Sequence, residues 1–198
     1  MKISFCIGNG TSRADFDLTT LTQGPTYGCN LLVESFSLDN TIVCDKAVLI
    51  HLMGQGYQNR TNLYTRLEWQ KTIDDKRLQV LPQGYSPVDH KYDEERNWSS
   101  GIYAVWLAVQ QNADVVVMLG YDLWSNNVTN NNVYIESSFY KTTPVDPAAW
   151  IHQLARIFTL YPHTSFVQIQ PPDWKVPTEW EQIDNFSLDS YKGLEELG

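Results

Sequence analysis

The chain has 198 residues, which suits one domain with one sizeable hydrophobic core. Its formal net charge is -9, and its lysines and arginines are scattered, so long nucleic acid is excluded as an expected partner. Cys6, Cys29 and Cys44 are odd in number and lack CxxC spacing. Because they lie in or beside apolar segments, we expect buried free thiols and neither disulfides nor metal ligands.

The N-terminus carries one lysine and only a short apolar run. It therefore resembles neither a signal peptide nor a transmembrane segment. We expect a cytoplasmic protein, with assembly into a virus particle as a second option.

The first predicted strand covers Lys2–Ile7 and runs directly into the glycine-rich turn Gly8-Asn9-Gly10. Ser12, Arg13 and Asp15 follow, and a helix can start among them. Free backbone N–H groups at such a turn, together with the positive end of a helix dipole, form an anion site. The stretch predicts a ligand contact at Gly8, Asn9, Gly10 and Ser12.

Strands and helices then alternate along the chain. We expect a second strand, a short helix and a third strand, interrupted at Asp45-Lys46, over Thr26–Asn30, Leu31–Phe36 and Thr41–Leu52. Leu63–Lys71 fits either a strand or a short helix, and Leu78–Leu81 is a short strand. Pro82–Asn97 is a long polar surface loop, in which the charge run at residues 93–96 is expected to be solvated.

The clearest predicted helix is Ser99–Asn112, with apolar residues at helical spacing and Ser99 or Ser100 as N-cap. Val115–Leu119 has no polar alternation and predicts a central strand that ends at Gly120. Residues 133–140 fit a strand or an extended lid. Asp146-Pro147 starts a helix that runs to about residue 160, and residues 165–169 form a last strand.

This alternation predicts an α/β fold with a mostly parallel sheet and helices on both faces. We expect a single domain over residues 1–172 and an acidic tail, residues 173–198, that packs on it. Ligands of such sheets bind at the carboxyl ends of the strands. The residues that meet there are the predicted nucleotide-binding set: Gly8, Asn9, Gly10, Ser12, Asn30, Ser99, Ser100, Gly101, Gly120, Tyr121 and Asp122.

These blocks, in this order, resemble the bacterial lipooligosaccharide sialyltransferases, a Rossmann-like family that uses a CMP-sugar donor. Ile7–Ser12 is similar to the family's first donor loop, and Cys29-Asn30 to the end of its second strand. Lys46-Ala47-Val48 is similar to its third strand. Ser99–Tyr103 is similar to its helix start, and Leu119–Asp122 to the end of its last strand. The resemblance covers about Met1–Asp122. The third block puts His51 at a strand end where the family has an Asn.

The chain departs from the family at the catalytic base. The family's His stands shortly before the helix that here begins at Asp146, and this chain has Phe139–Thr143 there instead. The candidate catalytic residues are therefore His51, Tyr140 and Tyr134, although a tyrosine, with a pKa of about 10, is a poor base at neutral pH. Of two family tyrosines that touch the donor phosphate, Trp124 takes one place and Tyr134 approximates the other.

The resemblance implies a glycosyltransferase-like protein that binds a nucleotide-activated sugar, with a CMP-sugar favoured, and transfers the sugar to an unknown acceptor. The missing His supports an alternative: an inactive transferase-like fold that serves as a binding or structural protein, as a homo-oligomer or within a complex. A third hypothesis is a nucleotide-dependent pyrophosphokinase, which requires Mg²⁺ at strand-end carboxylates such as Asp45 and Asp122. No residues have metal-ligand spacing, and no cofactor is expected.

Overall fold

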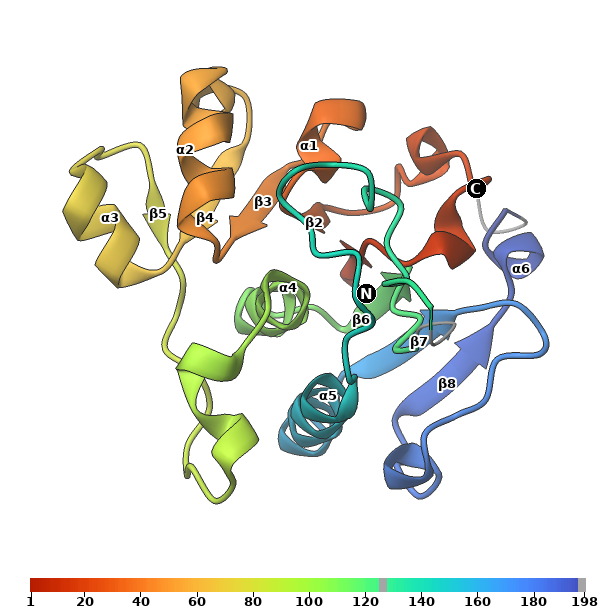
Figure 1. Cartoon of the computed structure of the whole chain (residues 1–198). Helices are drawn as coiled ribbons and strands as arrows, with labels where there is room; N and C mark the ends of the chain where they lie inside the picture. Colours follow the sequence, from red (N-terminus) through yellow and green to blue (C-terminus); the bar gives the residue numbers. More distant parts are fainter. Residues whose placement is uncertain (125–127, 196–198) are drawn as a thin grey trace.

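The computed structural model describes residues 1–124 and 128–195. Eight strands form one sheet in the order β5-β4-β3-β2-β1-β6-β7-β8, and every neighbouring pair is parallel (Figure 1). The strands β1 to β8 span Ile3–Ile7, Thr26–Cys29, Asn40–Val43, Asn62–Thr65, Gln79–Val80, Val115–Leu119, Ser165–Ile169 and Phe186–Asp189. The predicted α/β fold is thus confirmed, and the sheet is parallel throughout.

Helices cover both faces of the sheet. The helices α1 to α6 span Leu32–Ser35, Lys46–Gly54, Leu67–Ile73, Ser100–Gln110, Ala148–Leu160 and Tyr191–Glu195. Figure 1 shows α4 and α5 on one side of the sheet and α1 and α2 on the other. Among the described residues, no helix combines the length and the apolar character that crossing a membrane requires.

The central strands supply side chains to both layers. In β1, Cys6 packs towards α4, while Phe5 and Ile7 pack with α1 and α2. In β6, Met118 and Leu119 divide in the same way between the two clusters. Apolar side chains on both faces are what a strand buried between two helical layers requires, which explains the unbroken apolar run of β6.

The predicted third strand over Thr41–Leu52 is wrong beyond Val43, where β3 ends. The Asp45 side chain accepts hydrogen bonds from the backbone N–H groups of Ala47 and Val48, and this N-cap starts α2. The apolar run that follows buries Val48, Leu49 and Leu52 on one helical face. His51 therefore lies in the middle of a helix and not at a strand end, and the match of Lys46–Val48 to a third strand fails.

Other segments differ from prediction in smaller ways. Leu63–Lys71 contains both alternatives, since β4 ends at Thr65 and α3 follows, and β5 covers only two residues. Residues 133–140 form turns and no strand. The loop at residues 82–97 is only partly solvated, because it buries Tyr85 and Asp93.

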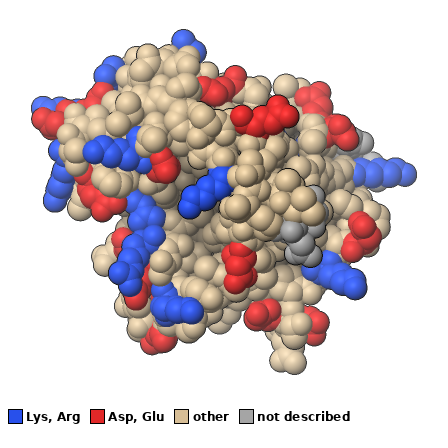
Figure 2. All heavy atoms as spheres, in the orientation of Figure 1, with Lys and Arg blue, Asp and Glu red and all other residues tan. Residues whose placement is uncertain are grey.

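The described residues of the expected tail, 173–195, do more than pack on the domain. They contribute β8, which pairs with β7 and extends the sheet by a strand, and Trp180, which is almost fully buried. Acidic and basic side chains are interspersed on the face that Figure 2 shows, without a continuous basic surface.

Candidate functional site

A cleft of about 320 Å³ opens at the carboxyl ends of β1, β2 and β6. At this point the chain leaves β1 to one side for β2 and later returns on the other side as β6, and such a switch point is where parallel sheets bind ligands. The predicted nucleotide-binding residues that line this cleft are Gly8, Asn9, Gly10, Asn30, Ser99, Ser100, Gly101, Gly120, Tyr121, Asp122 and Trp124. Ser12 lines a neighbouring cleft instead.

The glycine turn is fastened to the end of β6. The N–H groups of Gly8 and Gly10 donate to the carbonyl oxygens of Leu119 and Gly120, at 2.7 and 2.8 Å. A Cβ on Gly8 would lie 2.5 Å from the Gly120 oxygen, and Gly120 itself has a φ of +67°. Both positions require glycine, the first for a close backbone approach and the second for a left-handed conformation.

Asp122 occupies the place that the turn was expected to offer to an anion. Its carboxylate is buried and accepts hydrogen bonds from the Ser12 N–H (3.0 Å), the Ser12 hydroxyl and the Asn131 side-chain amide (3.0 Å). The Thr11 N–H donates to Asn131 Oδ1 at 2.9 Å. The prediction of free N–H groups is therefore wrong at four positions of this turn, because backbone carbonyl oxygens accept from Gly8 and Gly10, and side chains accept from Thr11 and Ser12.

The N-terminus of α4 faces the same cleft. Ser99 caps it by accepting from the Ile102 N–H, while the Ser100 hydroxyl donates to Asn30 Oδ1 and accepts from the Cys44 N–H, each at 3.0 Å. Asn30 reaches this position with a left-handed φ of 55°. Within the described residues, the N–H groups of Ser100 and Gly101 have no hydrogen-bond partner, and they point out of the positive end of an eleven-residue helix.

Asn9 lines the same cleft as this helix end. Its Nδ2 donates to the Tyr140 hydroxyl at 3.2 Å, while its Oδ1 is buried and lacks a partner in the described part of the chain. Burial raises the pKa of Tyr140 well above its usual value, so the phenol stays protonated at neutral pH. In the cleft, Tyr140 is thus a neutral hydrogen-bonding group at that pH.

The other two candidate catalytic residues are not among the described residues that line the cleft. His51 pairs with Glu34 at 2.7 Å and packs, with ring centroids 5.0 Å apart, on Phe139, which itself lines the cleft. The Tyr134 hydroxyl bonds to that of Ser35, and its ring stacks on Tyr140.

Several lining residues were not predicted. Asn130, Asn131, Asn132, Phe139, Lys141 and Trp150 complete the wall. Three of them belong to the asparagine-rich run WSNNVTNNN, from which only Trp124 was predicted to contact the ligand. Residues 125–127 of that run lie outside the described residues.

Metal and thiol chemistry receive little support from the cleft. No group of three or more His, Cys, Asp or Glu side chains in the described residues is arranged to hold a metal ion. Asp45 caps α2, and Asp122 is held by its donors. Cys29 lines the cleft as a free thiol, but burial raises its pKa to about 12.

We compared the chain with protein-family models, with curated proteins and with solved structures. None of the three comparisons finds a match. The resemblance to the sialyltransferases accordingly stays a prediction from the residues quoted above.

Proposed function

We propose that the cleft binds a nucleotide-activated sugar, with a CMP-sugar as the favoured donor. The observation that carries the proposal is the buried Oδ1 of Asn9, which has no partner among the described residues, in the cleft that the open N-terminus of α4 also lines. A buried acceptor without a partner costs about 1–3 kcal/mol, which a ligand N–H or hydroxyl removes. The base or ribose of a nucleotide offers both kinds of donor.

The phosphate has a natural place at the helix end. The N–H groups of Ser100 and Gly101 and the helix dipole favour an anion there by about 0.3–1 kcal/mol, and Lys141 adds a positive charge at the rim. Backbone recognition of this kind needs little basic surface, which fits a chain with a net charge of -9.

Transfer of the sugar requires a base within reach of the acceptor hydroxyl. Among the described residues of the cleft, the ionisable groups are Tyr121, Tyr140, Lys141, Cys29 and the fully engaged Asp122, and the Tyr121 hydroxyl donates to the Gly101 carbonyl oxygen. This set favours the second candidate, a binding protein that keeps the donor intact. The pyrophosphokinase hypothesis has less support, because Asp45 and Asp122 are both committed to hydrogen bonds.

Isothermal titration of the full chain with CMP, CDP, UDP and ATP tests the binding proposal. We expect CMP to bind and Asn9→Ala to weaken it about tenfold, as the loss of one well-placed hydrogen bond predicts. Asn59→Ala is the matched control, because Asn59 is exposed and lies outside the cleft. If none of the four nucleotides binds, the proposal is refuted.

A second measurement separates the two candidates. Release of CMP from a bound CMP-sugar, followed by chromatography, indicates an active transferase or hydrolase when Asn9→Ala abolishes it. A donor that binds and stays intact with every offered acceptor favours the binding protein.

A further inference from the structure

A second cleft, of about 700 Å³, lies directly beside the first. The two share Asp122, Leu123 and Trp124, which form the wall between them. At the start of α5, Trp150 faces the first cleft and Ile151 the second. The outer wall of the second cleft is the segment at residues 171–179, which connects β7 to β8.

Gln170 lines this cleft from the carboxyl end of β7. It is 3% exposed, and its Nε2 donates to Asp122 Oδ1 at 3.3 Å. Its Oε1 is buried and has no partner among residues 1–124 and 128–195. A ligand hydroxyl that reached the inner end of the cleft would satisfy this acceptor, at a gain comparable to that at Asn9.

Two indole rings flank the opening. Trp124 is 50% exposed, and Trp174 is fixed by a hydrogen bond from its Nε1 to the Asp122 carbonyl oxygen at 2.8 Å. Flat aromatic surfaces combine apolar contact with polar edges and suit ligands that have both C–H faces and hydroxyl groups. A sugar ring is such a ligand.

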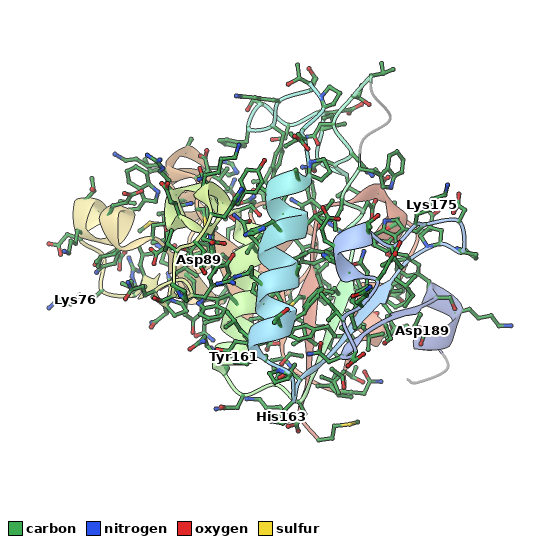
Figure 3. The ribbon with its side chains drawn as sticks, turned by 90° about the horizontal axis from the view of Figure 1, so that it is seen from below. Lys76, Asp89, Tyr161, His163, Lys175 and Asp189 are labelled. Atoms are coloured by element: carbon green, nitrogen blue, oxygen red, sulfur yellow. The ribbon has the colours of Figure 1, made fainter. Side chains whose placement is uncertain are left out.

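The rim gives no strong field of either sign. Asp173, Lys175 and Glu179 are all exposed and mix both charges. Lys175 projects on the side of α5 opposite to Asp89, as Figure 3 shows. A rim of mixed charge offers hydrogen bonds to hydroxyl groups and does not select for a charged ligand.

We propose that the second cleft binds an uncharged saccharide through Gln170, Trp124 and Trp174. The choice of a saccharide rests in part on the proposed function, because an uncharged saccharide beside a nucleotide-sugar cleft would serve as the acceptor. Leu123 in the shared wall has a left-handed φ of 55°, a costly conformation for leucine, and it sets the wall between the two ligands.

Saturation-transfer NMR on the full chain tests the proposal, with methyl β-galactopyranoside, methyl β-glucopyranoside and lactose at millimolar concentration, in the absence and presence of CMP. We expect saturation to reach the ring protons of at least one saccharide. Trp124→Ala and Gln170→Leu should each weaken that binding by up to about tenfold. Leu160→Ala is the control, because Leu160 is 41% exposed at the far end of α5 and should leave binding unchanged.

The outcomes are distinguishable from those of the nucleotide test. Saccharide signals that both cleft variants leave intact place the saccharide elsewhere and overturn the proposal, as does the absence of signals from all three probes. If CMP fails to bind while the saccharide signals respond to Gln170→Leu, a position that lines the second cleft and not the first, the saccharide cleft stands and the nucleotide proposal falls. Far-UV circular dichroism of each variant verifies that it is folded.

Discussion

Replacing Asp122 tests whether its carboxylate stabilises the wall that the two clefts share. The side chain is 3% exposed and accepts from the Ser12 N–H, the Ser12 hydroxyl and the Asn131 amide, with Gln170 as a fourth donor at 3.3 Å. Asp122→Ala leaves these donors without an acceptor. Since a hydrogen bond to a charged group contributes about 1.5–3 kcal/mol, and water compensates part of the loss, we expect the free energy of unfolding to fall by about 4 kcal/mol.

Asp122→Asn should cost much less, about 1 kcal/mol. Its remaining oxygen keeps the Ser12 N–H and the Asn131 amide, while its new NH₂ group faces two partners that can turn. The Ser12 hydroxyl can donate to Tyr191, 3.0 Å away, and accept from the new amide. The Gln170 amide can rotate so that its unpartnered Oε1 becomes the acceptor.

Urea unfolding of the wild type and both variants, with linear extrapolation to water, measures these changes. The expected order is wild type, Asn and then Ala, with about 3 kcal/mol between the two variants. Equal losses for Asn and Ala would show that the negative charge itself, and not the hydrogen-bond geometry, stabilises the wall. A loss below about 1 kcal/mol for Ala would refute the reasoning altogether.

Three further predictions follow from the described contacts. Gly8→Ala, which puts a Cβ 2.5 Å from a backbone oxygen, should destabilise by about 2 kcal/mol or more, whereas Gly54→Ala, with no described atom within 4 Å, should stabilise by up to about 1 kcal/mol; equal shifts in urea midpoint would argue against the close approach. Burial raises the pKa of Asp93, but hydrogen bonds from His152, Tyr85 and two backbone N–H groups outweigh it and lower the pKa to about 2. Because the pKa lies below the unfolded value of 3.8, this carboxylate contributes about 2 kcal/mol above about pH 4, which is lost as the pH falls towards 2, and Asp93→Asn should flatten that part of the stability curve. Burial raises the pKa of Cys29 to about 12, so iodoacetamide should label Cys29 at pH 8 only after unfolding in urea, and rapid labelling of the native chain would contradict its burial.

Local pattern was enough to predict much of the fold. The unbroken apolar run of Val115–Leu119 predicts the strand β6, and the helical spacing within Ser99–Asn112 predicts the helix α4. The ends of these two elements line the cleft. The same local rules failed over Thr41–Leu52, where strand and helix carry similar apolar residues. A single cap at Asp45 decides between them there.

Long-range contacts were out of reach of such rules. Asn131 is positioned at the site by a hydrogen bond from Thr11, which is 120 positions away in the chain. No periodic pattern in the neighbouring sequence predicts this contact. Asp93 is buried because His152 bonds to it from α5, yet its neighbours in sequence form a charged run. The strand β8, with the sequence FSLD and three exposed residues, lacks the apolar character that would distinguish it from a tail.

The late position of β8 in the chain orders the assembly of the two clefts. The first cleft draws on residues up to Trp150, so it can form once α5 has packed. The wall at residues 171–179 is held later, by Trp174, by the buried Trp180 that bonds to the Ile151 carbonyl oxygen, and by the pairing of β8 with β7. On a ribosome, where the N-terminal part emerges first, the nucleotide cleft is expected to precede the saccharide cleft, and an early intermediate would expose β7 as an open sheet edge.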